Sequence, residues 1–365
     1  MSVQLIEKIS QYWRNIQGNL LPWLGEQLGP LNEKQQQLVA TLEFLRIEEF
    51  VQYYLGINCI GRPLEDRTAI ARAFVAKAIY NLSTTRQLLD RLESDVKLRR
   101  ICGWERADQI PGEWTFSRAF SEFANAELTQ RVHEVLVKEY QSERLVGHNN
   151  RDSTAIEARE KAFKKDRSKK KEKPNPKEPT RVERQVNMTS AAQMLAEIPK
   201  RCDIGTKKDS NGNTYSWKGY KLHIDTVDGG IPISAVLTSA SVHDSQVAIP
   251  LMKMSSDRVT NCYDLMDAAY DSGVIRLYSF GLGHVPLIDF NRRSKKDTRS
   301  FMPHEKQRYK HRSAAERTNA RLKDEFGGLY VRVRGHAKVM THLMFGMLAL
   351  TVDQLLRFLT PEPAS

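Results

Sequence analysis

The spacing of apolar residues changes twice along this chain, and the change limits the folds that it can adopt. Between residues 4 and 141, apolar residues recur every three or four positions, which is typical of amphipathic helices. From Leu145 onward, short runs rich in β-branched and aromatic residues take their place. Helical spacing returns from Arg312 to Phe358. This order predicts a helical domain followed by a domain in which strands and helices are mixed.

The middle of the chain contains four runs with the length and composition of strands, at 217–227, 231–241, 261–267 and 284–290. Helical segments at 245–254 and 272–280 separate some of them, and Gly229-Gly230 is typical of a hairpin turn. The fold class that we expect is therefore mixed α+β or α/β. It has a helical domain over residues 1–140 and a mixed sheet flanked by helices over residues 145–360.

Positive charge is in excess, with a formal net charge of +12 and a pI near 9.4. A basic excess of this size attracts polyanions, of which nucleic acid is the commonest. The stretch 161–184 holds eleven Lys or Arg against four acids, together with three prolines, and cannot bury apolar surface. We expect a flexible basic loop over residues 161–185, inserted in the second domain. It is either solvated surface or a phosphate contact, with Lys164, Lys165, Lys169 and Lys170 as the candidate residues.

Another candidate DNA contact lies near the end of the helical domain. The segment from Trp114 to Phe120 has small polar and basic residues at a helix start, which suits the recognition helix of a helix-turn-helix unit. We expect Thr115 to cap a helix over residues 116–143, with Arg118 as the candidate DNA contact. An ordinary packed helix is the alternative.

Composition disfavours several other classes of protein. The four cysteines stand too far apart for a structural zinc site or a disulfide framework, and the first residues lack a secretory pattern. The most apolar stretch, 339–359, is interrupted by polar residues such as His342 and Asp353. They break the run of about 18 apolar residues that a membrane span needs. The sequence predicts a cytoplasmic protein with no membrane partner.

The most specific pattern runs from Tyr309 to Lys323. On a helix, Arg312, Glu316, Asn319 and Lys323 share one face, and Tyr309 lies at the edge of that stripe. A carboxylate flanked by cations suits a site that holds a divalent ion and a DNA phosphate together. A surface helix with i,i+4 ion pairs would show the same spacing.

This segment resembles the signature Y-x₂-R-x₃-E-x₆-K around the catalytic glutamate of bacterial insertion-sequence transposases of the DDE type. Tyr309, Arg312, Glu316 and Lys323 match its four positions. The segment 147–156 is similar to the stretch that carries that family's first catalytic aspartate, and the segment 263–272 is similar to the stretch that carries the second. The likeness extends from about residue 65 to residue 355.

The resemblance implies a ribonuclease-H-like catalytic domain in which Asp152, Asp267 and Glu316 are both the catalytic residues and the metal ligands. Three hard oxygen donors suit Mg²⁺ or Mn²⁺, and two such ions would serve DNA cleavage at transposon ends and strand transfer into target DNA. Four residues of the stripe are candidate DNA contacts: Tyr309, Arg312, Asn319 and Lys323.

The expected partners also follow from the resemblance. They are double-stranded DNA, both as terminal inverted repeats and as target, and a second copy of the chain, because transposases of this type usually pair two ends within a dimer. A ribonuclease-H-like nuclease or resolvase and a non-catalytic, transposase-derived DNA-binding protein are the alternative functions. A tyrosine recombinase with Tyr309 as nucleophile fits poorly, because the separated Arg and His elements that it needs are missing.

Other aspartates compete for the first two catalytic positions. Asp264 and Asp271 flank Asp267, which we prefer, and strand alternation places Asp264 on the opposite face. Asp203, Asp209, Asp225 and Asp244 could each replace Asp152, and we prefer Asp152 because its local sequence is the match. We expect His243 to be structural and Asp244 to cap the helix that follows it.

Overall fold

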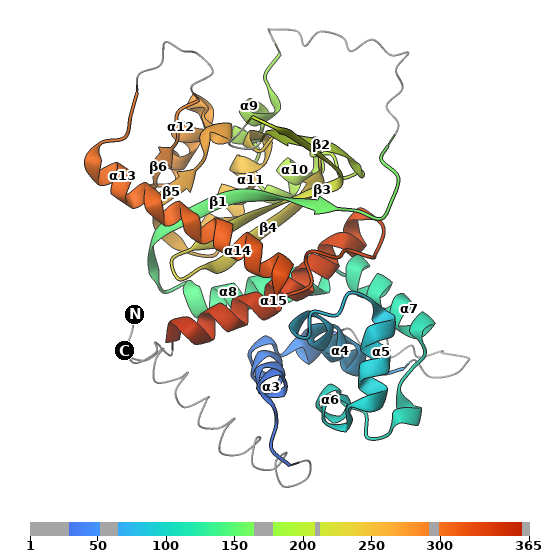
Figure 1. Ribbon diagram of the computed structural model, residues 1–365. Coiled ribbons are helices and arrows are strands. Elements are labelled where there is room, and N and C mark those ends of the chain that lie inside the picture. Colours follow the sequence, from blue (N-terminus) through green and yellow to red (C-terminus); the bar gives the residue numbers. More distant parts are fainter. Residues whose placement is uncertain (1–28, 52–64, 164–177, 209–211, 292–298, 360–365) are drawn as a thin grey trace. The chain divides into compact units, whose positions relative to one another are not determined.

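The computed structural model describes residues 29–51, 65–163, 178–208, 212–291 and 299–359. The chain divides into two compact units (Figure 1). The first consists of Met1–Tyr140, Arg321–Arg332 and Ala337–Ser365, and the second of Gln141–Ala320 and Val333–His336. The last long helix therefore belongs to the helical unit, whereas we had grouped it with the sheet.

The first unit is helical throughout its described residues, as the apolar spacing predicts. Its helices are α3 (Glu33–Leu45), η2 (Ile47–Phe50), α4 (Arg67–Ile79), α5 (Thr85–Ser94), α6 (Val96–Cys102), η3 (Ala107–Gln109), α7 (Glu113–Asn125), α8 (Leu128–Gln141) and α15 (His336–Leu359). Every residue of α4 except Arg72 is buried. Phe74 of α4 packs against Phe116 and Phe120 of α7 and against Phe345 of α15, with ring centroids 4.9–5.8 Å apart. Aromatic burial on this scale holds the helices around one core.

The helix that we predicted over residues 116–143 is two helices. α7 begins at Glu113 with Gly112 at its N-cap, so Thr115 lies inside the first turn and caps nothing. The break falls at Glu127, whose φ of 49° is in the left-handed region and cannot continue a helix.

Helix α15 is long and apolar enough to cross a membrane, but 78% of its apolar window is buried inside the protein. In the second half of α15, Asp353 accepts a hydrogen bond from Gln37 of α3, and Thr351 forms a hydrogen bond with His133 of α8. We interpret α15 as the central core helix of the first unit.

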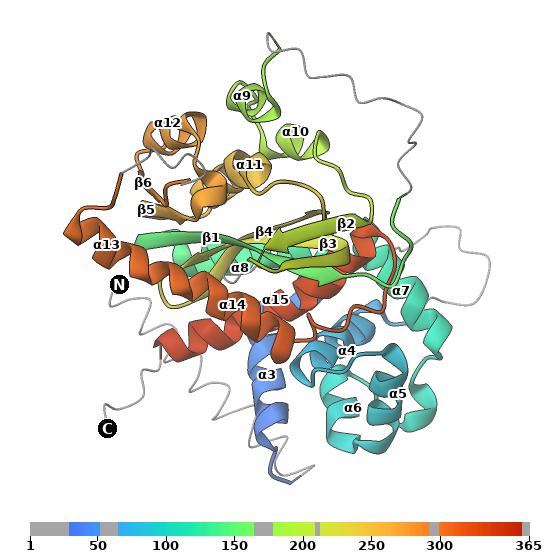
Figure 2. The ribbon, with the colours of Figure 1, turned by 45° about the horizontal axis from the view of Figure 1, so that its top comes forward.

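The second unit is built on a six-stranded mixed sheet, in the order β2-β3-β1-β5-β6, with β4 paired to β3 (Figure 2). The strands are β1 (Leu145–Glu157), β2 (Asp203–Lys208), β3 (Thr214–Val227), β4 (Ile231–Ser239), β5 (Thr260–Met266) and β6 (Val285–Ile288). β1 pairs in parallel with β5 and antiparallel with β3. The four predicted runs correspond to β3, β4, β5 and β6, and Gly229 and Gly230 form the β3–β4 turn with positive φ. The mixed α+β class, consistent with a ribonuclease-H-like core, is confirmed.

Helices cover both faces of this sheet. α9 (Arg181–Val186), α10 (Ala191–Ala196), α11 (Ser245–Ser256) and α12 (Gly273–Gly281) lie on one face, as Figure 2 shows. On the other face, α13 (Pro303–Tyr309), the 3₁₀ turn η5 (Lys310–Arg312) and the start of α14 (Ser313–Asp324) cross β1. A further 3₁₀ turn, η4 (Ala268–Tyr270), follows β5.

The predicted basic loop ends earlier than we expected. Arg181 begins α9, with Thr180 at its N-cap in a capping box, and Gln185 is buried there. Lys164, Lys165, Lys169 and Lys170 lie outside the described residues.

Candidate active site

Asp152 lies near the middle of β1, where strand alternation turns it away from the face that its neighbour Arg151 occupies. The Asp152 side chain is 11% exposed. Its two carboxylate oxygens accept hydrogen bonds from Asn319 Nδ2 of α14 at 3.0 Å and from Arg312 Nη2 at 3.2 Å. The carboxylate is therefore held from the side of α14.

Asp267 directly follows β5, the parallel neighbour of β1. Asn150 pairs with Leu265 in the register of these strands, so Asp152 and Asp267 stand at equivalent positions two residues further on. Asp267 Oδ1 accepts a hydrogen bond from the backbone N–H of Ala269 at 2.9 Å, which fixes the side chain at the start of η4. Its other oxygen lies 3.7 Å from Arg312 Nη2.

Glu316 lies in the first turn of α14, with its side chain 58% exposed. Its Oε1 accepts a hydrogen bond from Arg312 Nη1 at 2.8 Å, one helical turn away. The single guanidinium of Arg312 thus contacts carboxylates from three separate elements: β1, the end of β5, and α14.

The electrostatics of this group are set by burial and by an excess of negative charge. Burial raises the pKa of Asp152 and of Asp267. The charge of Asp267 raises the pKa of Asp152 further, and the charge of Asp244 raises that of Asp267 further, whereas the charges of Arg312 and Lys207 oppose both increases. Burial alone would lower the pKa of Arg312, but the surrounding acids, Asp152 first, hold it above its ordinary value. The site therefore favours additional positive charge.

The donor set of the three carboxylates fits a divalent cation of the hard class. All three side chains offer oxygen donors, which Mg²⁺ and Mn²⁺ prefer, and none offers the sulfur or imidazole nitrogen that zinc prefers. A cation among them would also offset the charge excess that Arg312 balances only in part.

Comparison with known protein families identifies the chain. Residues 152–352, more than half of its length, match the family described as Transposase DDE domain. The chain belongs to the DDE transposases. Residues 25–122 match a second family, described as Transposase domain (DUF772). No curated protein and no solved structure matches the chain. The transposase is thus an enzyme that acts on DNA, of a family that uses divalent metal.

The competing aspartates of the transposase are engaged elsewhere. Asp264 is 1% exposed and accepts hydrogen bonds from Ser279 and His284. Burial alone would raise its pKa, but His284 and the charge of Arg151 lower it. Asp225 is fully buried against Arg151 and Ser255. Both lie on the opposite face of the sheet from Asp152, as we expected for Asp264.

Asp244 occupies the N-cap position of α11, as predicted, but its side chain caps nothing. It accepts a hydrogen bond from Lys221 Nζ at 2.9 Å instead. Burial opposes the effect, but the nearby His223 and Lys221 lower the pKa of Asp244. The expectation of a capping bond is wrong because the half-buried Lys221 of β3 competes for the carboxylate. His243 bonds the hydroxyl of Ser245 at 2.9 Å, as a structural residue would.

The predicted stripe is not one continuous helix, because α13 gives way to η5 before α14 begins. Tyr309 donates a hydrogen bond to the backbone oxygen of Met266 at 3.1 Å, and burial raises its pKa above the ordinary value. The hydroxyl of Tyr309 and the amide nitrogen of Asn319 thus have partners inside the fold, which spacing alone did not reveal. DNA contact by these two residues, by Arg312, by Lys323 and by Arg118 stays a prediction.

Arg118 lies in α7 with its guanidinium 4.0 Å from the ring centroid of Trp114, whose side chain is 65% exposed. An exposed aromatic ring with a cation stacked on it is compatible with nucleic-acid contact and also with plain surface stacking.

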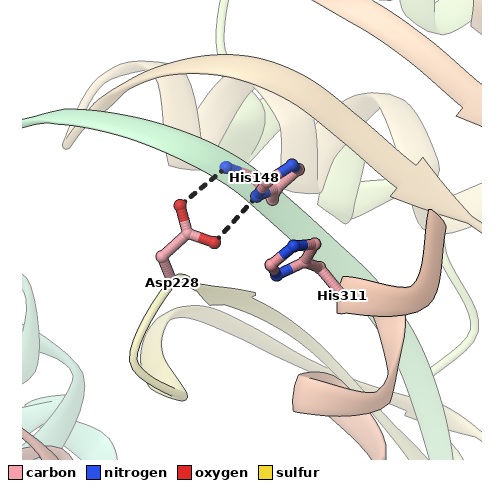
Figure 3. A group of neighbouring side chains, drawn as sticks. All are labelled: His148, Asp228 and His311. Atoms are coloured by element: carbon pink, nitrogen blue, oxygen red, sulfur yellow. Dashed lines mark hydrogen bonds and ion pairs between the residues drawn. The ribbon is translucent and has the colours of Figure 1, made fainter. Parts of the chain in front are cut away.

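A second group of potential ligands, absent from our sequence analysis, lies beside the triad. His148 of β1, Asp228 of the β3–β4 turn and His311 of η5 bring their ligand atoms within 4.8 Å of one another (Figure 3). Asp228 accepts hydrogen bonds from the backbone N–H of His148 at 3.0 Å and from its Nδ1 at 2.9 Å. In the sequence, the only sign of this group is the segment 147–156, which contains His148 and which we singled out for Asp152.

Proposed function

We propose that the transposase cuts DNA at the ends of its element and joins them to target DNA at Asp152, Asp267 and Glu316. The observation that carries this proposal is the contact of one guanidinium, that of Arg312, with all three carboxylates. Folding alone does not require three acids from distant parts of the sequence to meet at one point on the sheet. A site that binds cations does require such a group of acids.

Within this proposal, the three carboxylates hold the ions. Divalent ions held there would supply the activation of a water or a 3′-hydroxyl and the stabilisation of the leaving oxygen in an in-line displacement. The chain's own residues supply the positions. Asn319 fixes one oxygen of Asp152, and the backbone of Ala269 fixes one oxygen of Asp267.

Arg312 has two tasks in this proposal. In the absence of ions it balances the acids through both terminal nitrogens. Where ions took over the carboxylates, its guanidinium would be free to bind a phosphate oxygen, for which its planar pair of donors is well suited. Lys323, Arg118 and the lysines of the basic loop would add phosphate contacts that fix the DNA without reading its sequence.

The substrates, assembly and location that we propose follow the family. They are terminal inverted repeats and target DNA, a homodimer on paired ends, and the cytoplasm. The helical unit that contains α3 to α8 is our candidate for binding the terminal repeats.

The test is single-turnover cleavage of DNA that carries the element's ends, with the full chain in Mg²⁺ or Mn²⁺. We expect no cleavage in EDTA. Asp152→Asn, Asp267→Asn and Glu316→Gln should each lower the rate by about 10³-fold or more and leave DNA binding intact, because each keeps its shape and loses the charge that holds an ion. Glu197→Gln, which removes an exposed acid paired with Arg184, is the matched control and should cleave normally.

The outcomes separate the alternatives. Cleavage without joining to target DNA would favour the nuclease or resolvase. Specific binding without cleavage in any divalent ion would favour a non-catalytic DNA-binding protein. Near-normal cleavage by Glu316→Gln would refute the triad.

A further inference from the structure

The segment that delivers Arg312 and Glu316 to the site lies across two neighbouring strands. His148 of β1 and Tyr263 of β5 are register partners, so their side chains stand side by side on one face of the sheet. Their rings are stacked, with centroids 5.7 Å apart. Each ring is then covered by a planar group from the segment 308–311.

The two covering groups come from residues three positions apart. Arg308, at the end of α13, places its guanidinium 4.4 Å from the centroid of the Tyr263 ring. His311, in η5, stacks on His148 with centroids 4.2 Å apart and an angle of 10° between the rings. Between them, Tyr309 bonds the backbone of Met266 at the end of β5. The segment is thus fastened at three successive points.

Asp228 fixes the ring on which His311 rests. Its carboxylate bonds both the backbone N–H and Nδ1 of His148, so that the imidazole cannot turn (Figure 3). Gly147 makes this approach possible, because a Cβ added there would lie 2.8 Å from Asp228 Oδ2. The His148 side chain is only 10% exposed, whereas His311 is exposed.

The ring geometry argues against a metal ion between these three residues. Imidazole nitrogens direct their lone pairs in the plane of the ring. Two rings that are parallel within 10° at 4.2 Å cannot aim those lone pairs at one point. An ion shared by both imidazoles would require one ring to leave the stack.

We propose that His311 and Arg308 form a stacking clamp on His148 and Tyr263, and that His311 is a positioning residue for the third carboxylate. The existence of the clamp does not depend on the proposed function; only its expected effect on cleavage rests on that function. It docks η5 on the sheet, and η5 leads directly into the turn of α14 that carries Glu316. Without the clamp, η5 would leave the sheet more often, and Glu316 would meet Asp152 and Asp267 for less of the time.

The first test is amide hydrogen exchange of the full chain without DNA or added metal. His311→Ala should raise the exchange rates across residues 309–316 by about fivefold. This is the increase in the population of the open state that the loss of one aromatic stack should cause. Exchange in β3 and β4 should stay unchanged. His311→Phe keeps a flat ring and should behave as the wild type. His304→Ala, the same substitution at an exposed position of α13, is the matched control.

The second test is single-turnover cleavage at saturating DNA. His311→Ala should lower the rate by about fivefold with end binding unchanged, and His311→Phe should restore it. If wild type does not cleave, the proposed function fails while the exchange result still judges the clamp. Wild-type exchange in His311→Ala would overturn the clamp. A loss of cleavage rate in His311→Phe equal to that in His311→Ala would also overturn the clamp, because the imidazole nitrogens would then matter. A Zn²⁺ titration of the wild type would show whether those nitrogens bind metal.

Discussion

The charge of Arg312 is the part of the site that can be tested without DNA. Arg312→Met removes the guanidinium and keeps most of the apolar stem, so the change isolates charge from packing. Three acids then face one another without the guanidinium that contacts all of them. The cost of that arrangement can be worked out from the exposure of each partner.

The pair with Asp152 dominates the expected loss, because the two side chains are only 19% and 11% exposed. Removing one partner of a buried pair costs about 3–5 kcal/mol, and the surviving bond from Asn319 reduces this. The pair with Glu316, whose side chain is 58% exposed, adds only about 0.3–0.5 kcal/mol. We therefore expect a loss of about 3 kcal/mol, which corresponds to about 6–12 °C in Tm for a unit of this size.

Divalent ions should offset about half of that loss. In the wild type an ion competes with Arg312 for the carboxylates, whereas in Arg312→Met it does not. If the ion binds tenfold tighter to the variant, saturating Ca²⁺ should stabilise the variant by about 1.4 kcal/mol more than it stabilises the wild type.

The assay is urea unfolding at pH 7.5, with EDTA or with Ca²⁺. Calcium supplies positive charge without DNA cleavage, and a concentration of about 10 mM is chosen to approach saturation. Arg317→Met is the matched control, since Arg317 is exposed on the same helix and bonds only Ser313 among the contacts described. Equal stability of the two variants in EDTA, or equal effects of Ca²⁺ on variant and wild type, would refute the idea that Arg312 substitutes for the ions.

Three further predictions concern neighbouring groups. Tyr309→Phe loses only the bond to Met266 and should keep measurable cleavage, and denaturing gels should show no covalent protein–DNA adduct in either protein; a trapped adduct that depends on Tyr309 would contradict the triad. His342 is buried and its pKa is lowered to about 3, so its stabilising effect is complete above pH 6.5 and falls by about 1.4 kcal/mol per pH unit as the pH drops from 6.5 toward 3. His342→Gln should flatten the pH dependence of the urea midpoint between pH 6.5 and 5, and an unchanged slope would count against it. Arg151→Met should cost about 3–5 kcal/mol by leaving Asp225 unpaired, whereas Asp152→Asn should change stability by less than about 1 kcal/mol and abolish cleavage; equal losses of stability would show that Asp152 is a structural acid like Asp225.

The parts of the fold that the sequence predicted are those whose signal is local. β3 and β4 were predicted from the length and composition of their runs and from Gly229-Gly230 between them, and both glycines have positive φ in the turn. The pairing of Arg312 with Glu316 was foreseeable for the same reason, since four residues on a helix bring two side chains together.

β1 was not predicted as a strand, although it carries Asp152. Its residues from His148 to Asp152 are polar or charged and all buried, which contradicts any hydrophobic pattern. They are stabilised by partners that come from elsewhere in the chain, such as Asp225 and Asp228 of the β3 region. A polar strand of this kind can be inferred only when its partners are known, and the family resemblance supplied Asp152 where the pattern could not.

The same strand separates two kinds of charge by alternation alone. Arg151 faces α11 and meets Asp225, so that its charge is balanced inside the core. Asp152, one residue later, faces the other way and shares a single guanidinium with two more acids. Such an excess of negative charge is stable only where a cation offsets it. The balanced pair of Arg151 and Asp225 on the opposite face holds β1 in place. The negative charge that these acids gather is therefore a consequence of where β1 places Asp152, and in the function that we propose it is the property that holds the ions.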